Sequence, residues 1–302
     1  MRYEGSLDES VATDLGSVTQ HSVQRVSDHF AEQRIVGDGN ISPNRFVVNA
    51  GVEAKIVLDN VNIQTNGYSP FEMSGATVDL YLKGTNILTC KGSSHGAGLQ
   101  TSETSILTIN SFDPSNNTSG TLIATGNYHG AGIGAACTTG NTNSGGGDRK
   151  NAGNITIKGG TIIATGGQLA AGIGGGSETG STPGSYGTIK IEGGNITATG
   201  GSETYGGAGI GAAGGRTSNS PWSNSGTIII TGGKINATGV SGGAGIGGGT
   251  NFDGGTIEIS SEANVTATGY NTNYTDPNGI SKSIGSGSGG NPITVTNTYD
   301  KS

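Results

Sequence analysis

Residues 187–211 read GTIKIEGGNITATGGSETYGGAGIG and contain three short apolar phrases separated by glycine. The first two phrases, Thr188–Ile191 and Asn195–Thr199, alternate apolar and polar side chains, as a strand with one buried face does. The third phrase is the AGIG at residues 208–211. The glycine pairs between the phrases favour turns. We therefore expect three short strands joined by turns in this stretch.

The same three phrases recur along the chain. AGIG begins at Ala131, Ala171, Ala208 and Ala244, and the Ala-Thr-Gly that ends the second phrase begins at Ala124, Ala164, Ala198, Ala237 and Ala267. Self-similar units of this length are typical of a solenoid, in which each unit buries its apolar side against its neighbours. Three strands per unit predict an all-β, single-stranded parallel β-helix with one coil per unit.

The alternation also assigns the faces of the strands. The residues expected to point inward are Ile155, Ile157, Ile189, Ile191, Ile228, Ile230, Ile257 and Ile259 in the first phrase, Leu122, Ile162, Ile196, Ile235 and Val265 in the second, and Ile133, Ile173, Ile210, Ile246 and Ile284 in the third. The outward positions of the second phrase hold pairs such as Thr197 and Thr199. Such rows resemble those of ice-binding solenoids, but Ile123, Ile163 and Asn236 interrupt them, and outward threonine is ordinary on a strand.

The first residues of the chain follow a different pattern. Between Leu7 and Gln33, apolar residues fall at a spacing of three to four, which predicts one amphipathic helix. We expect residues 1–34 to form this helical segment and residues 35–302 to form the β-helix. The helix would either cap the open end of the solenoid or attach the protein to a partner, including a second copy of itself. Both roles stay open at this point.

The composition excludes several classes of partner. The chain has 302 residues, 60 of them glycine, and a net charge of −7 from 15 basic and 22 acidic residues. This charge argues against binding to nucleic acid or to an anionic membrane surface. No apolar run approaches the roughly 20 residues of a membrane span. Residues after Met1 do not look like a signal peptide, so the protein is expected to be cytosolic, exported without a leader, part of a particle such as a virion, or a piece of a larger secreted protein.

The two cysteines do not predict a disulfide or a metal site. Cys90 and Cys137 fall on different phrases of different units and lack the spacing of metal ligands. Cys90 aligns with Ala124, an inward position, and is expected to be a small buried hydrophobe.

The repeated unit resembles a known group of modules. The pattern Gly-x-Ile-x-Ile-x-Gly-Gly-x-Ile-x-Ala-Thr-Gly-Gly, followed by Gly-Ala-Gly-Ile-Gly-Gly-Gly, resembles glycine-rich modules in surface proteins of clostridia and related gut bacteria. Residues 55–63 and 78–84 look like the first coils of a carbohydrate-binding β-helix family that includes pectin-binding members. This resemblance covers roughly residues 45 to 295. It implies non-catalytic polysaccharide binding, with calcium as a candidate ligand. Glycine-rich tips of phage tail fibres are a second, looser resemblance, which the missing leader and the N-terminal helix fit better.

The loops between the phrases carry the candidate binding residues, because loops on a rigid scaffold are where such residues concentrate. Aromatic rings can stack on sugar faces, and charged side chains can bond hydroxyl groups or hold calcium. The candidates are Tyr186, Trp222 and Phe252 in loops after the third phrase, Tyr128 and Tyr205 after the second, and the charged residues Asp148, Arg149 and Arg216. As an alternative, these rings simply cover the flanks of the solenoid.

Two histidines occupy matching places in adjacent units. His95 and His129 each precede Gly-Ala-Gly, so stacked coils would bring them together as a metal-binding or pH-sensitive pair. The alternative is a polar loop position that was duplicated, which is favoured because no third ligand is visible.

Catalysis is not favoured. A polysaccharide lyase or hydrolase needs carboxylates, or a carboxylate and a base, that converge on one face, and the acidic residues of the regular units are scattered. The sequence therefore predicts a non-enzymatic, adhesin-type module that binds a polysaccharide or surface glycan through its loops, outside the cell or on its surface. The alternatives are a phage or phage-like tail tip on a virion, which binds a receptor, and a polysaccharide-cleaving enzyme.

Overall fold

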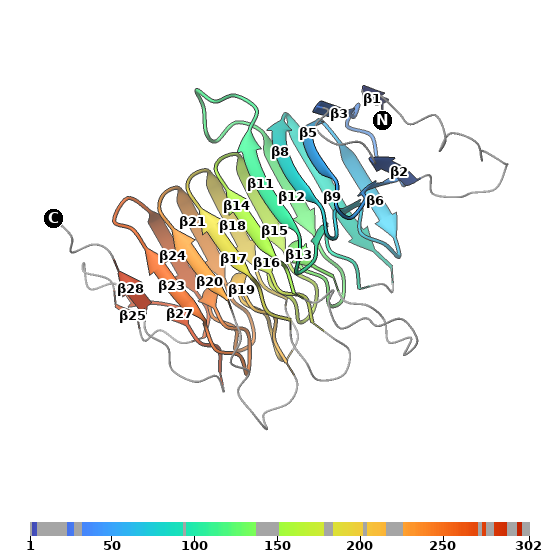
Figure 1. Ribbon diagram of the computed structural model, residues 1–302. Coiled ribbons are helices and arrows are strands. Elements are labelled where there is room, and N and C mark those ends of the chain that lie inside the picture. Colours follow the sequence, from blue (N-terminus) through green and yellow to red (C-terminus); the bar gives the residue numbers. More distant parts are fainter. Residues whose placement is uncertain are drawn as a thin grey trace.

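The computed structural model describes residues 2–4, 23–26, 32–92, 95–136, 151–177, 184–201, 204–215, 226–270, 274–275, 281–288 and 295–297. The described chain winds into coils that stack along one axis from the N-terminal to the C-terminal end (Figure 1). Each regular coil contributes one strand to each of three sheets, which we call A, C and B in the order in which the chain visits them. The predicted parallel β-helix with three strands per coil is confirmed.

The strands are grouped by sheet. Sheet A contains β1 (Arg2–Glu4), β3 (Glu32–Val36), β5 (Glu53–Asp59), β8 (Thr77–Lys83), β11 (Ile106–Ser111), β14 (Asn154–Ile157), β17 (Thr188–Ile191), β20 (Thr227–Ile230), β23 (Thr256–Ile259) and β28 (Val295–Asn297). Sheet C contains β6 (Asn62–Asn66), β9 (Thr85–Lys91), β12 (Thr121–Thr125), β15 (Thr161–Thr165), β18 (Asn195–Thr199), β21 (Lys234–Thr238) and β24 (Asn264–Thr268). Sheet B contains β2 (Val23–Val26), β4 (Arg45–Val48), β7 (Phe71–Glu72), β10 (Leu99–Thr101), β13 (Ile133–Ala135), β16 (Ile173–Gly174), β19 (Ile210–Gly211), β22 (Ile246–Gly247) and β27 (Ile284–Gly285). A separate pair joins β25 (Tyr274–Thr275) to β26 (Ser281–Lys282).

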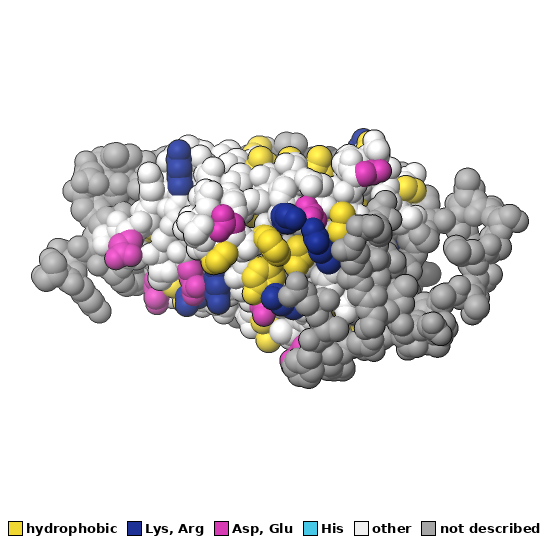
Figure 2. Space-filling model, turned by 90° about the horizontal axis from the view of Figure 1, so that it is seen from above, with side chains coloured by type: hydrophobic (Ala, Val, Ile, Leu, Met, Phe, Trp, Pro, Cys, Tyr) yellow, Lys and Arg dark blue, Asp and Glu magenta, His cyan; other side chains and the backbone are white. Residues whose placement is uncertain are grey.

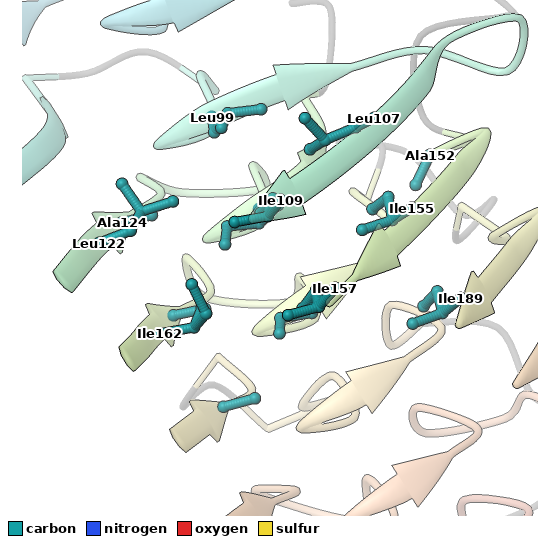
Figure 3. Packing of buried hydrophobic residues seen from close by; sticks show 14 of the residues in the cluster. Leu99, Leu107, Ile109, Leu122, Ala124, Ala152, Ile155, Ile157, Ile162 and Ile189 are labelled. Carbon is teal, nitrogen blue, oxygen red and sulfur yellow. The ribbon is translucent and has the colours of Figure 1, made fainter. Parts of the chain in front are cut away.

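Like residues stack on like residues through the core. Ile155 of β14 pairs with Ile189 of β17, which pairs with Ile228 of β20, in parallel register. All the aliphatic residues expected to point inward are buried. Their side chains project from the strands into the interior of the coil (Figure 3). Because short aliphatic ladders fill this narrow core, burial of apolar surface holds the coils together with few aromatic rings.

One alignment in the first coils is wrong. Leu88, and not Cys90, pairs with Ala124. Cys90 lies two residues further along β9, at the next inward position, and is still buried with 3% exposure. The position opposite Leu122 holds Asn86, which is fully buried. Its amide donates to the Lys83 and Thr121 carbonyls and its oxygen accepts from Val61 N–H, so this polar group is satisfied inside the core.

The N-terminal helix is not formed in the part of residues 7–33 that the structure describes. Val23–Val26 is strand β2, which pairs in parallel with β4, and Glu32–Val36 is strand β3, which pairs in parallel with β5. The ladder therefore begins before residue 35. The edge of β4 offers unpaired backbone groups, and pairing with them stabilises Val23 and Val26 in a strand more than a weak helical spacing can stabilise a helix. Beyond β3, strand β1 pairs antiparallel and ends sheet A. Residues 5–22 and 27–31 lie outside the described residues.

Loops cover the outer face of sheet B. The loops that follow its strands fold back onto the loops that follow sheet C: Ser177 N–H donates to the His129 carbonyl, Gly214 N–H to Leu169 and Thr250 N–H to Gly206. From β10 to β27, sheet B is thus buried on both faces, whereas sheets A and C each present one face to solvent. Along the regular coils, the outward strand side chains that reach solvent therefore belong to sheets A and C.

Candidate functional site

Two of the predicted binding residues are part of the interior. Tyr186 and Phe252 have exposed fractions of 2% and 3%. The Tyr186 hydroxyl donates to the Gly254 carbonyl at 2.6 Å, and burial raises the pKa of this tyrosine. Because the loops after sheet B fold back against it, these rings fill the space beneath the loops and have no surface to offer a ligand. For Tyr186 and Phe252, the alternative prediction is therefore confirmed: these rings cover the flank of the solenoid.

The other predicted residues are divided between surface and undescribed segments. Tyr128 is 38% exposed and Tyr205 is half-buried, both in loops that follow sheet C. Trp222, Arg216, Asp148 and Arg149 lie outside the described residues, so their role in binding stays a prediction.

The two histidines meet as the repeat predicts. The ring centroids of His95 and His129 are 4.8 Å apart in an edge-to-face arrangement, and Tyr128 lies 5.5 Å from His95. Burial lowers the pKa of His95. Among the described residues, no group of three or more His, Cys, Asp and Glu side chains could hold a metal ion. His95, His129 and Tyr128 thus form a compact aromatic cluster, and burial favours the neutral form of the His95 imidazole.

A second aromatic group lies on sheet A and was missed from the sequence. Tyr81 projects outward from β8, and Phe112 follows directly after β11 with 45% of its surface exposed. Lys55 Nζ lies 4.8 Å from the centroid of the Tyr81 ring, and Lys83 Nζ lies 5.6 Å from that of Phe112. We call Lys55, Tyr81, Lys83 and Phe112 the sheet A platform. The alternation Leu80-Tyr81-Leu82 could have revealed that Tyr81 faces outward.

The register places these side chains on neighbouring rows. Tyr81 pairs with Asn110 of β11, and Phe112 N–H donates to the Leu82 carbonyl at 3.0 Å, beside Lys83. Strands in a sheet lie about 4.8 Å apart, so Tyr81 and Phe112 are diagonal neighbours in the register of sheet A. Figure 2 shows one gathering of hydrophobic, basic and acidic side chains on the face seen from above.

An ion cluster supports the edge of the platform. Asp59 of β5 is 5% exposed and its Oδ2 accepts from the Arg34 guanidinium at 2.5 Å and from Lys83 Nζ at 3.1 Å. Burial alone raises the pKa of Asp59, but the hydrogen bonds and charges of Arg34 and Lys83 outweigh it, so the pKa lies below its usual value. The cluster fixes the ammonium group of Lys83 between the carboxylate and the Phe112 ring.

The substitution Asp59→Asn should lower the free energy of unfolding at pH 7 by about 1–2 kcal/mol, because it takes a buried carboxylate away from the half-exposed cations of Arg34 and Lys83. A carboxyl group whose pKa is depressed on folding stabilises the fold above its unfolded pKa of about 3.9 and loses this effect as the pH falls through the folded value. Urea unfolding at pH 7, 4 and 2.5 should therefore show the two proteins converging at low pH. Asp79→Asn, at an exposed carboxylate on β8, is the control. An equal loss with Asp79→Asn, or a constant difference down to pH 2.5, would contradict the role of the Asp59 cluster.

No helix long and apolar enough to cross a membrane occurs in the described part of the chain. No curated protein and no solved structure matches the chain significantly. Four segments, residues 118–137, 155–177, 189–215 and 228–250, match the family model described as a beta helix repeat. These segments coincide with the coils from β12 to β22, where the three phrases are complete. The chain therefore carries beta helix repeats, and both the repeats and the three parallel sheets support a protein of the parallel β-helix kind.

Proposed function

We propose that this protein binds a polysaccharide or surface glycan without cleaving it, and that the sheet A platform is a contact site. The observation that carries the proposal is the pair of outward aromatic rings, Tyr81 and Phe112, on a stiff parallel sheet. A sugar ring presents C–H groups on its face and hydroxyl groups at its edge. Aromatic rings pack against the C–H groups, and charged or amide side chains form hydrogen bonds with the hydroxyl groups.

Polar groups for the edge of a sugar lie beside the rings. Lys55 and Asp79 are exposed neighbours on paired strands, and Asn110 lies next to Tyr81 in the register. Lys83 adds an ammonium group held in place by Asp59. This combination of donors and acceptors is what hydroxyl recognition requires.

The site is also rigid before any ligand binds. Residues 112–119, which follow β11, are braced by their own side chains: Asp113 Oδ1 accepts from Ser115 N–H at 2.9 Å, and Asn116 Oδ1 accepts from the Thr118 hydroxyl at 2.8 Å. Preorganisation lowers the entropic cost of binding. The resemblance of the repeats to clostridial surface modules supports the same function, and it implies a location outside the cell.

A glycan array followed by titration calorimetry tests the proposal. The full chain should bind at least one glycan class, and Phe112→Ala should weaken that binding by tenfold or more, since an anchoring aromatic typically contributes over 1.4 kcal/mol. Tyr270→Ala removes an aromatic ring that is 51% exposed outside the platform and is the matched control. The bound oligosaccharide should be recovered intact.

Three outcomes would contradict the proposal. A folded chain that binds no glycan would exclude the function. Loss of binding in Trp222→Ala but not in Phe112→Ala would assign the glycan to the loops instead of the platform. Release of shortened oligosaccharides would assign an enzymatic activity.

A further inference from the structure

The outward face of sheet C has a different chemistry from that of sheet A. The strands β9, β12, β15, β18, β21 and β24 share three outward positions, which the register aligns into three rows that run along the solenoid axis. The longer β9 adds Lys91 at its end, beside these rows. One outer row is threonine in all six coils: Thr89, Thr125, Thr165, Thr199, Thr238 and Thr268. We call these eighteen outward positions the threonine face.

The first three coils of this face are the most regular. There the middle row is Ile87, Ile123 and Ile163, and the second outer row is Thr85, Thr121 and Thr161. Ile163 is 37% exposed. Neighbouring strands are about 4.8 Å apart, and alternate residues along a strand about 6.6 Å. The result is an apolar track along the axis with a row of hydroxyl groups on each side.

The hydroxyl rows are held in place. β-branched side chains have few rotamers. The threonines also lie on strands that pair with a neighbour on each side, except for β24, which ends the sheet and pairs on one side. At the C-terminal end the Thr238 and Thr268 hydroxyls lie 3.1 Å apart, within hydrogen-bonding distance. Along the all-threonine row, a ligand that matches one coil therefore meets the same group again in the next.

The threonine face is also nearly uncharged. Lys234 is the one charged side chain among its eighteen positions, all of which the structure describes. On the same coils the outward side chains of sheet A include Asp79, Lys83, Lys190 and Glu258. Both sheets are parallel, half-exposed and made of similar strands, so strand propensity does not account for the difference between them.

We infer that the threonine face binds an uncharged polysaccharide chain that lies along the solenoid axis. The apolar faces of the sugar rings would cover the isoleucine track, and their hydroxyl edges would bond the threonine rows. The low charge, one lysine among eighteen positions, fits a neutral polymer, and the repeat along the axis fits a ligand that is itself a repeating chain. The inference shares the ligand class of the proposed function but concerns a separate surface.

Two other occupants fit the observations less well. Ice would require a hydroxyl lattice that is regular in two dimensions, whereas the middle row changes from isoleucine to Thr197, Asn236 and Thr266 along the axis. A polymer chain needs regularity in only one direction. A second copy of this chain would be expected to bury a more apolar centre than three isoleucines among threonines.

Retention on insoluble neutral polysaccharides tests the inference. The full chain is sedimented with cellulose, chitin and starch granules, each in low and high salt. We expect retention on at least one of them, unchanged by salt because no charges take part. The double variant Ile123→Lys, Ile163→Lys should lower retention tenfold or more. The control is Ile229→Lys, the same substitution at an outward position of sheet A, where the register neighbour is already Lys190.

The readouts separate this inference from the proposed function. Binding of the soluble glycan at the platform, measured by calorimetry, should be weakened by Phe112→Ala but not by the Ile123→Lys, Ile163→Lys double variant, which should lose retention on the insoluble polysaccharide. Absence of retention on all three polysaccharides, or equal loss with Ile229→Lys, would overturn the inference. Dimerisation that the double variant abolishes would assign the face to a second copy, and inhibition of ice recrystallisation without retention would assign it to ice. Circular dichroism establishes that each variant is folded.

Discussion

Replacing Gly174 with alanine should destabilise the protein by about 3 kcal/mol or more. Gly174 ends β16 with a φ of +130°, a conformation that side chains of L-residues rarely adopt. A Cβ atom there would lie 2.1 Å from the carbonyl oxygen of Gly211 in the next coil. The obstacle is backbone that belongs to the ladder, so it cannot turn aside as a flexible side chain can. The same contact recurs in every coil from β13 to β22.

Gly67→Ala is the matched control for this prediction. Gly67 also has a positive φ, +103°, but nothing lies within 4 Å of its Cβ position. This variant should therefore lose only the conformational part of the energy, about 1–3 kcal/mol. Urea unfolding followed by circular dichroism compares the two midpoints. Equal losses would show that the approach of adjacent coils is not what requires glycine at the end of β16.

Tyr186→Ala should cost about 3–5 kcal/mol, because it empties a fully enclosed ring site beneath the loops that cover sheet B. Tyr186→Phe keeps the ring and removes the hydrogen bond to Gly254, so its cost should be about 1–2 kcal/mol. Hydrogen exchange should become faster at residues 184–187 and 252–254 in the alanine variant. Unchanged protection there would show that the ring does not hold the loops.

The raised pKa of Tyr186 adds a pH dependence to this prediction. A phenol whose pKa is raised on folding stabilises the fold below its unfolded pKa of about 10, and it loses this effect as the pH rises above that value. Between pH 9 and 11 the wild type should therefore lose more stability than Tyr186→Phe. Parallel curves for the two proteins would mean that the hydroxyl is not desolvated.

The regular coils could be predicted because their signal is local and repeated. Alternation in β14 and β17 identifies Ile155 and Ile189 as inward, and the fixed spacing of the phrases sets one above the other. Adjacent copies also predicted the contact between His95 and His129. The helix expected at residues 7–33 was wrong at β2 and β3, where the decisive interaction is pairing with β4 and β5, distant in sequence.

The candidate sites depended on information that alternation does not contain. Tyr186 and Phe252 occur in glycine-rich loops, a context that suggests exposure, yet the loops fold back over sheet B and enclose both rings. Lys55 and Tyr81 lie on the successive strands β5 and β8, Phe112 directly follows β11, and the three become neighbours only through the register. Trp222 lies outside the described residues, and its predicted role awaits the variant experiment.

The sequence by itself determined the coil, its three strands and the inward face of each strand, because period-two patterning and a repeat of fixed phrases need no knowledge of distant contacts. The tertiary structure alone decided which outward surfaces exist. Hydrogen bonds between loops, such as Gly214 to Leu169, close over sheet B and remove it from solvent. Sheets A and C stay open, and the stacking register gathers an aromatic platform on the first and a threonine face on the second. Both surfaces arise from contacts between coils. Taken alone, each of their residues is an ordinary outward side chain of its own strand.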